Sequence, residues 1–241
     1  MAPSLLQRKK KMEKNIKKEL HRYFSQFLTK KRQEKIKKNL PKRTRHVAVA
    51  LEDLYQSGNT SAILRTADAL GVQDVHCIEG RNQFDVNNGI SLGSAKWLTV
   101  DRYRTENNQT NNATQECIES LKNQGYKVVA TSPHAVKPLS SLPIEDKTVF
   151  LFGTEDQGLT EQAIDLADDS VEIPMYGFVE SFNVSVSVAL CLYDFTTRLR
   201  SSSVAWQLTE EEQLELEIDW MRNSVENADA IERRFFEEMV K

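Results

Sequence analysis

Three short segments hold the side chains of this chain that are best suited to chemistry. The first runs from Asn59 to Arg65, the second contains Glu155, and the third contains Ser181 and Asn183. Amide, guanidinium, carboxylate and hydroxyl groups that lie together can orient a polar ligand and guide a proton. Each segment also has an ordinary structural explanation.

The first segment, 59-NTSAILRTADALG-71, has the pattern of a helix that ends at a glycine. Asn59 stands at its start and Arg65 nearly two turns later, so the two side chains can project to related sides. The simplest role for Arg65 is a surface ion pair with Asp68 or Glu52. Most of this helix is apolar, however, and a guanidinium buried there requires a carboxylate or phosphate partner.

The second segment, 150-FLFGTEDQGLT-160, reads as an apolar strand that ends at Gly153, with Glu155 soon after it. Ligands of parallel sheets gather beyond the carboxyl ends of the strands. Gly153 permits a close approach of backbone, and Gly158 permits a tight turn. A plain exposed acid at position 155 explains the pattern equally well.

The third segment, 181-SFNVSVSVAL-190, opens an apolar helix with polar residues. Ser181 and Asn183 are poor residues for a helix interior, because their side chains compete for backbone hydrogen bonds. Capping of the helix explains them most simply. The alternative is that this helix end faces a ligand.

Strand and helix patterns alternate through the middle of the chain, which predicts a mostly parallel sheet with helices on both faces. The expected strands are 46–54, 72–80, 96–103, 126–133, 148–155 and 169–175, and the expected helices are 59–71, 111–124, 160–168 and 183–200. Two polar stretches rich in glycine or asparagine, 81–95 and 104–112, are expected to be loops.

Charge is distributed very unevenly in this chain of 241 residues with net charge −3. Residues 1–45 hold 17 Lys or Arg against three Glu, whereas residues 208–241 hold 11 Asp or Glu against four Lys or Arg. A basic arm on an otherwise acidic protein indicates a polyanionic partner.

Both ends of the chain have helical patterns. Residues 4–40 predict one amphipathic helix that Pro41 stops, and residues 208–241 predict one or two acidic helices. The basic helix suits packing on the main domain, phosphate binding or a membrane surface, and we favour packing together with RNA contact. The acidic tail can pack on the core, on a partner subunit or on the basic arm, and the sequence does not choose among these.

Several classes of protein are unsupported by the sequence. No apolar run approaches the ~18 residues that a membrane span requires, and the basic N-terminus lacks the apolar segment of a signal peptide. The three cysteines are widely spaced, which indicates reduced thiols in a cytoplasmic protein rather than a zinc site. No dinucleotide-binding glycine motif, phosphate loop or nucleophile elbow occurs.

The three segments, taken together and in this order, resemble the motifs of the SPOUT-class, TrmH-type RNA ribose 2′-O-methyltransferases. The matching stretches are 59-NTSAILRTADALGV-72, 150-FLFGTEDQGLT-160 and 173-IPMYGFVESFNVSVSVAL-190, and the resemblance covers about residues 46–200. The third stretch is the most specific. The family usually has Leu where this chain has Phe182, which affects packing near the expected ligand.

The resemblance implies an α/β fold with a mostly parallel sheet and a C-terminal deep trefoil knot, a feature that is rare in proteins. It implies three parts: a basic helical RNA-binding arm at 1–45, a SPOUT methyltransferase domain at 46–200, and an acidic helical extension at 201–241. It further implies a homodimer that associates through the knot region, with no metal.

The resemblance also implies roles for individual residues. Arg65, Asn59, Glu155, Ser181 and Asn183 fall on the family's catalytic positions. The expected contacts with S-adenosylmethionine, largely through backbone, are Thr131, Gly153, Ile173, Met175, Phe182 and Asn183. The polar start of the last helix then serves both as a cap and as part of the ligand site.

The implied reaction is an in-line attack of a ribose 2′-hydroxyl on the sulfonium methyl group. One hypothesis gives the role of base to Arg65, with help from the substrate phosphate. Because a guanidinium is nearly always protonated, Arg65 is alternatively a residue that positions phosphate and hydroxyl. Asn59, Glu155 and Asn183 would orient Arg65 or the ribose.

The short helical extensions favour tRNA as the substrate, with the D-loop guanosine at position 18 as the methylated nucleotide. The alternatives are a ribosomal RNA ribose, and a non-catalytic RNA-binding protein of the same fold. Methyl transfer to tRNA, to ribosomal RNA or to neither distinguishes the three.

Overall fold

The computed structural model describes residues 5–85, 91–104 and 110–239. It divides the chain into two compact units, one formed by Thr44–Trp206 and the other by Met1–Arg43 with Gln207–Lys241. Parts of the two expected loops, residues 86–90 and 105–109, lie outside the described residues. The expected three-part division and its functional labels stay predictions.

Unit Thr44–Trp206 contains one six-stranded sheet, in which every pair of neighbouring strands is parallel. Its strands are β1 (Val47–Glu52), β2 (Asp74–Glu79), β3 (Thr99–Arg104), β4 (Lys127–Thr131), β5 (Thr148–Phe152) and β6 (Asp169–Val171). Their order in the sheet is β3-β2-β1-β5-β4-β6. The six strands that the sequence predicts are all present, and the parallel α/β class is confirmed. The trefoil knot stays a prediction.

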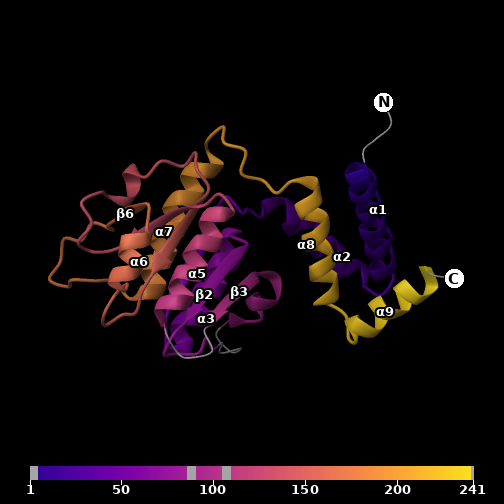
Figure 1. Ribbon diagram of the computed structural model, residues 1–241, viewed down its shortest axis with the longest axis horizontal. Coiled ribbons are helices and arrows are strands. Elements are labelled where there is room, and N and C mark those ends of the chain that lie inside the picture. Colours follow the sequence, from indigo (N-terminus) through magenta and orange to yellow (C-terminus); the bar gives the residue numbers. More distant parts are fainter. Residues whose placement is uncertain (1–4, 86–90, 105–109, 240–241) are drawn as a thin grey trace. The chain divides into compact units, whose positions relative to one another are not determined.

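Helices cover both faces of this sheet (Figure 1). They are α3 (Ser57–Leu70) and α7 (Val184–Arg200) on one face, and α5 (Thr110–Asn123) and α6 (Glu161–Leu166) on the other. The pleat of β1 explains this, because alternate side chains point to opposite faces. Val47, Val49 and Leu51 pack with α3 and α7, whereas Ala48 and Ala50 pack with α5.

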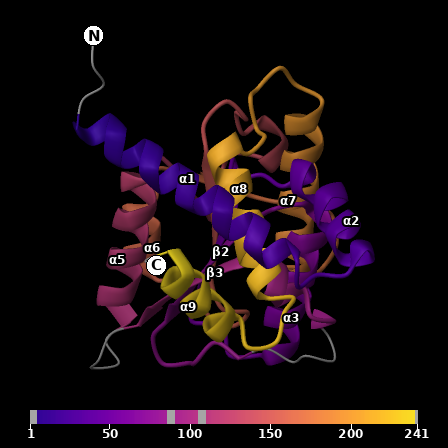
Figure 2. The same ribbon diagram turned by 90° about the vertical axis from the view of Figure 1, so that its right-hand side faces the viewer.

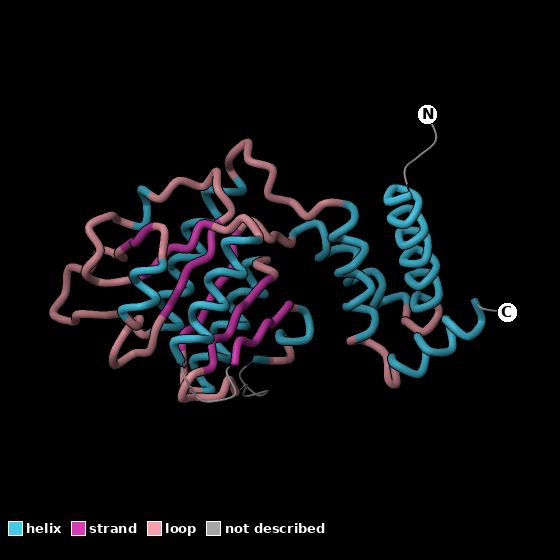
Figure 3. Tube along the Cα trace, viewed as in Figure 1, coloured by secondary structure: helices cyan, strands magenta, loops and turns pink. Residues whose placement is uncertain are grey.

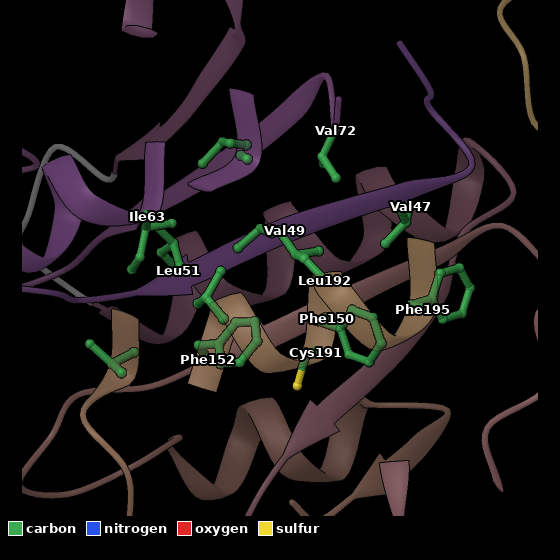
Figure 4. Close-up of a cluster of buried hydrophobic side chains, with 14 of the residues drawn as sticks. Val47, Val49, Leu51, Ile63, Val72, Phe150, Phe152, Cys191, Leu192 and Phe195 are labelled. Carbon is green, nitrogen blue, oxygen red and sulfur yellow. The ribbon is translucent and has the colours of Figure 1, made fainter. Parts of the chain in front are cut away.

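The core between β1, β5, α3 and α7 is the larger of the two hydrophobic clusters. Phe150 and Phe152 of β5 face Leu192 and Phe195 of α7 (Figure 4), and these four side chains are almost fully buried. Phe150 and Phe195 meet edge to face, with ring centroids 5.6 Å apart. This packing fixes where α7 begins, and therefore where Asn183 stands.

The regular elements described in the second unit are all helices, joined by loops (Figure 3). It contains α1 (Leu5–Ser25), α2 (Lys30–Asn39), the 3₁₀ turn η1 (Leu40–Lys42), α8 (Glu210–Arg222) and α9 (Ala228–Met239). The acidic α8 packs along the basic α1 (Figure 2). Of the three places that the sequence left open for the acidic tail, the structure selects the basic arm.

The single helix predicted for residues 4–40 is wrong, since α1 ends at Ser25 and α2 starts at Lys30. Thr29 has an extended backbone, and its hydroxyl accepts a hydrogen bond from the backbone N–H of Arg32, so it caps α2. The Gln33 side chain donates to the backbone oxygens of Ser25 and Leu28, which satisfies the end of α1.

Oppositely charged side chains join α1 and α8. The Lys17 ammonium pairs with Glu215 and lies 3.9 Å from Glu211. One turn further along, the His21 ring lies 3.1 Å from the Glu217 carboxylate. One side of α1 therefore contacts the acidic tail.

No described helix is long and apolar enough to cross a membrane. Cys77, Cys117 and Cys191 are buried in the sheet unit and form no disulfide. Burial raises the pKa of each thiol well above its ordinary value. A buried thiol that stays protonated is a poor nucleophile, so these cysteines act as small apolar core residues.

Candidate active site

Three of the residues selected from the sequence meet beyond the carboxyl ends of β1 and β5. Nδ2 of Asn59 donates to Oε1 of Glu155, and Nδ2 of Asn183 donates to Oδ1 of Asn59 over 3.1 Å. The three side chains come from the first turn of α3, the loop after β5 and the residue before α7. A hydrogen-bonded chain therefore joins all three motifs.

The start of α7 fixes which atoms donate and which accept in these hydrogen bonds. Oδ1 of Asn183 accepts from the backbone N–H of Ser185 over 2.9 Å and from its hydroxyl over 2.6 Å. A backbone N–H can only donate, so the Asn183 amide must turn its NH₂ group towards Asn59. Asn59 in turn accepts from Asn183 and donates onward, and Glu155 receives the last hydrogen bond.

Asn183 is the N-cap of α7, as the simpler interpretation of the third segment predicts. It also belongs to the hydrogen-bonded chain, so the cap and the candidate site share one side chain. Asn59 differs slightly from expectation, because α3 begins two residues earlier, at Ser57. The Asn59 side chain therefore does not cap the helix and remains available to Glu155 and Asn183.

A tight hairpin holds Glu155 in place. The backbones of Thr154 and Gly158 exchange two hydrogen bonds, of 3.1 and 2.9 Å. Gly158 has a φ of +70°, which glycine adopts without strain. A Cβ atom at Gly153 would stand 2.0 Å from the carbonyl oxygen of Gly158, so only glycine fits at this position.

The second carboxylate oxygen of Glu155 differs from the first. Oε2 is buried and has no hydrogen-bond partner among the described residues. A buried carboxylate oxygen without a donor is costly, so this atom is suited to receive a donor from a ligand.

Arg65 contacts none of these side chains. It is exposed on α3, and no hydrogen bond or ion pair joins it to a described residue. Arg65 therefore lies at the surface, as the simplest interpretation predicts, but it forms no ion pair with Asp68 or Glu52, and the alternative of a guanidinium buried in the apolar helix is wrong. Glu52 is instead buried and accepts hydrogen bonds from Thr114 and Thr160.

The residues expected to contact the methyl donor come to one edge of the sheet. Thr131 ends β4, Gly153 follows β5, and Ile173 and Met175 follow β6, which are three neighbouring strands. The Thr131 hydroxyl donates to the carbonyl oxygen of Leu151 over 2.8 Å, so this hydroxyl is already engaged within the sheet. Ile173 and Met175 are half-buried apolar side chains, of the kind that commonly line a small-molecule site.

Ser181 and Phe182 lie in the exposed loop that leads into α7. Phe182 keeps 37% of its surface exposed, and no hydrogen bond joins the Ser181 side chain to a described residue. The structure thus brings together Asn59, Glu155 and Asn183, and leaves Arg65 and Ser181 outside their hydrogen-bonded chain.

Two further residues take part in these hydrogen bonds and were not among the predicted site residues. Gln56 accepts from Nδ2 of Asn59 over 3.1 Å, and Ser185 orients Asn183. The spacing of Asn183 and Ser185, two residues apart at a helix start, is typical of a capping turn and was the available signal. Among the described residues, no group of three or more His, Cys, Asp or Glu side chains is placed to bind a metal.

Comparison with known proteins identifies a family for most of the chain. Residues 46–193 match the SpoU rRNA Methylase family. A tRNA (guanosine(18)-2′-O)-methyltransferase from Borreliella burgdorferi is 39% identical over 211 residues, which span 87% of this chain and 93% of that protein.

Two solved structures extend the comparison. The TrmH/SpoU tRNA modifying enzyme from A. aeolicus superposes with a TM-score of 0.71 at 28% identity, over 82% of this chain and 98% of that one. The SpoU methyltransferase AviRb from Streptomyces viridochromogenes, solved with AdoMet, shares the fold with a TM-score of 0.57 at 24% identity, over 68% of this chain and 65% of that one.

Proposed function

This chain belongs to the SpoU rRNA methylase family, and we propose that it transfers a methyl group from S-adenosylmethionine to a ribose 2′-hydroxyl of tRNA. The D-loop guanosine at position 18 is the proposed nucleotide, in line with the name of the relative that matches most of the chain. The observation that carries the proposal is the series of hydrogen bonds from Asn183 through Asn59 to Glu155. These hydrogen bonds bring all three motifs together beside the strand ends where the methyl donor is expected.

S-adenosylmethionine, when bound, supplies an electrophilic methyl group on sulfur. The backbone of Thr131, Gly153, Ile173 and Met175 would hold it at the carboxyl ends of β4, β5 and β6. Phe182 and Asn183 would close the site from the start of α7.

The remaining residues would act on the RNA. Asn59 and Asn183 hold the Glu155 side chain in one orientation. Arg65, an exposed guanidinium with no hydrogen bond or ion pair to a described residue, suits the phosphate next to the reacting ribose, and Ser181 suits a polar contact in the exposed loop. In this arrangement Arg65 positions the substrate.

The transfer of labelled methyl from S-adenosylmethionine to bulk tRNA, and separately to ribosomal RNA, tests this function. Nuclease mapping of the labelled ribose is expected to place the label at the D-loop guanosine. Label found only in ribosomal RNA would contradict the proposed tRNA substrate but would still support methyltransferase activity. Bound donor without transfer to either RNA would favour a non-catalytic RNA-binding protein.

The helical arm is proposed to bind the RNA backbone mainly through α2. Lys31, Lys35 and Lys38 are exposed at the spacing of one helix face, and none of them has a hydrogen bond or ion pair to a described residue. Lys17 of α1, in contrast, is paired with Glu215. Unpaired lysines release more counterions when they meet phosphate.

Replacing Lys31, Lys35 and Lys38 together with Gln is expected to weaken tRNA binding and to flatten its dependence on salt. Each lysine that contacts a phosphate lowers the slope of log affinity against log salt by about one unit. Binding titrations at several salt concentrations measure this, and donor affinity is expected to stay unchanged. The control is Lys17→Gln, and an unchanged slope in the triple variant would refute the role of α2.

The chain is further proposed to act as a homodimer through the exposed face of α7. Val186, Leu190 and Tyr193 lie at helical spacing, with 44%, 38% and 64% of their surfaces exposed. The preceding loop adds Tyr176 and Phe178, which are almost fully exposed. An exposed apolar helix face of this kind is typical of an interface between subunits.

We expect Leu190→Glu to convert a dimer into a monomer, because a carboxylate would be buried without a partner in the interface. Sedimentation velocity measures the mass against the chain mass of 27.6 kDa. Ile164→Glu is the matched control, since Ile164 of α6 is exposed to a similar extent, 47%, on another helix. A monomeric parent protein would contradict the proposal. A cytoplasmic location is also proposed, in keeping with the proposed tRNA substrate.

A further inference from the structure

We propose that three arginines of the sheet unit, Arg81, Arg102 and Arg104, form a surface that binds phosphates of the RNA substrate. This inference rests on the proposed function, and it adds a contact surface to the helical arm and to Arg65. The three arginines, called here the arginine cluster, lie towards and just beyond the carboxyl ends of β2 and β3. Two buried acids hold the cluster, and its guanidinium groups remain largely exposed.

The parallel register of β2 and β3 brings the cluster together. Cys77 of β2 stands beside Arg102 of β3, and Glu79 stands beside Arg104. Residues two apart on a strand share a face, so Arg102 and Arg104 project to the same side of the sheet as Glu79. Arg81 follows the end of β2 by two residues and extends the group.

The buried Glu79 carboxylate orients the two arginines of β3. Its Oε2 accepts from Nε of Arg104, and its Oε1 lies 3.5 Å from Nη1 of Arg102. The Phe84 backbone N–H donates to Oε1 over 2.9 Å, and the Arg102 guanidinium lies over the Phe84 ring, 5.2 Å from its centre. Side chains that are held in this way lose little conformational freedom when a phosphate binds.

The buried Asp53 carboxylate has a similar role for Arg81. Its Oδ1 accepts from the backbone N–H groups of Gly80 and Asn82, over 3.2 and 2.8 Å. Its Oδ2 lies 3.7 Å from Nε of Arg81. Asp53 therefore shapes the turn after β2 and keeps Arg81 beside it.

Neutralising the two acids does not account for the whole cluster. Three guanidinium groups face two carboxylates, which leaves one positive charge in excess. The side chains of Arg81, Arg102 and Arg104 keep 69%, 49% and 52% of their surfaces exposed. Each guanidinium has five N–H donors, and the contacts with the acids use only a part of them. The remaining donors are available to a ligand from solvent.

The charge of the sheet unit makes such a surface necessary for RNA binding. Residues 44–206 hold 12 Lys or Arg against 21 Asp or Glu, so this unit as a whole repels a polyanion. An RNA can therefore approach it only where positive charge is concentrated. Several of the other cations are paired with acids elsewhere in the unit, namely Arg45, Lys122, Lys127, Lys137 and Arg198.

Phosphate is the ligand that suits this surface. The planar fork of a guanidinium matches two phosphate oxygens, and the resulting hydrogen bonds are strengthened by charge. The location also fits an RNA. The carboxyl ends of parallel strands share one edge of the sheet, and β3 is only two strands, or about 10 Å, from β1. An RNA that presents a ribose beyond β1 would therefore carry neighbouring phosphates over the cluster.

Replacing Arg102 and Arg104 together with Gln tests the proposal. We expect the affinity for tRNA to fall at least about tenfold, because charge-assisted hydrogen bonds to phosphate are lost. The slope of log affinity against log salt should fall by about one unit for each phosphate contact removed. Equilibrium titrations with unmodified tRNA at several salt concentrations measure both quantities.

The matched control replaces Arg233 and Arg234 of α9 with Gln. This control changes the net charge of the protein by the same amount, and both side chains are exposed. Arg234 also pairs with an acid, Glu238, as Arg104 does with Glu79. The control is expected to keep the parent affinity and slope. An equal loss in the control would overturn the proposal, because it would show an effect of net charge alone.

Arg81→Gln keeps the test decisive if the double variant is unstable. The double variant removes partners of the buried Glu79, so urea unfolding and the affinity for S-adenosylmethionine are measured to verify its fold. Arg81 is more exposed, and Asp53 retains its two backbone donors in the Arg81→Gln variant. We expect this variant to lower the salt slope by about one unit. An unchanged affinity and slope in a folded variant would overturn the proposal, and if the double variant is unfolded, Arg81→Gln alone decides.

Binding and methyl transfer are measured separately, so two failures are distinguishable. A parent protein that binds tRNA but methylates no RNA would mean that the proposed function had failed, and the variants would still report on the cluster. A parent protein that methylates tRNA, together with folded variants that bind tRNA as the parent does, would mean that only the role of the cluster had failed.

Discussion

Arg65→Ala is expected to reduce methyl transfer to tRNA by at least about 10²-fold, the scale on which misplacement of a substrate lowers the rate. Arg65 has no partner among the described residues, so its removal leaves no buried group unsatisfied and should not unfold the domain. Donor affinity is expected to remain within a small factor of the parent value. Single-turnover transfer and equilibrium binding of S-adenosylmethionine measure the two effects separately.

Two control variants sharpen this result. Arg65→Lys keeps the charge and loses the planar fork, so partial activity would indicate that charge contributes apart from two-pronged recognition. Lys122→Ala removes another cation, which pairs with Asp168. Lys122 lies near the end of α5, just before β4 begins, and so at the end of the sheet opposite the candidate site. This variant is expected to leave methyl transfer unchanged. Near-full turnover of Arg65→Ala would show that the assignment of Arg65 to the substrate is wrong.

Gly153→Ala is expected to abolish donor binding and to lower the free energy of unfolding by about 3 kcal/mol or more, at the upper end of the cost of overpacking. The added methyl carbon would stand 2.0 Å from the Gly158 carbonyl oxygen and 2.3 Å from the Leu159 nitrogen. Because these are backbone atoms, no side chain can move to relieve the contact. The hairpin that holds Glu155 must open.

Gly177→Ala provides the matched comparison in the same edge of the domain. A Cβ atom there meets nothing within 4 Å. The same chemical change should therefore leave the affinity for S-adenosylmethionine and the free energy of unfolding near their parent values. Urea unfolding and donor titration of the two variants, side by side, measure the difference. Equal stability of both variants would refute the close approach of residues 153 and 158.

The sequence predicts the sheet unit well because its signals are local and strong. Each strand is a short apolar run bounded by polar or glycine residues, and a strand buried on both faces reads in this way. The break between α1 and α2 escaped the same reasoning. The helical pattern of the sequence continues through this break. The interruption depends on the side chains of Thr29 and Gln33, which form hydrogen bonds with backbone groups at the helix ends.

The candidate site was only partly predictable. The types of Asn59, Glu155 and Asn183 suggested chemistry, but the contacts between them depend on how β1, β5 and α7 pack. Arg65 shows the limit most clearly. The apolar pattern around it left burial and a surface ion pair both open, and the structure exposes Arg65 without an ion pair to a described residue.

Packing of the acidic tail was open for a similar reason. Many basic or apolar surfaces can attract an acidic amphipathic helix, and the choice among them is made by geometry. The pairing of Lys17 with Glu215, residues separated by 198 positions, is a contact that no local pattern contains.

The hydrogen bonds of the site also have a consequence for folding during synthesis of the protein. Asn59 is separated by 96 positions from Glu155 and by 124 from Asn183, so its partners are made long after it. Contacts between such distant residues form late, because long loops must close first. A growing chain on the ribosome therefore stays unable to modify RNA until α7 has emerged, and catalytic competence arrives only with the finished domain.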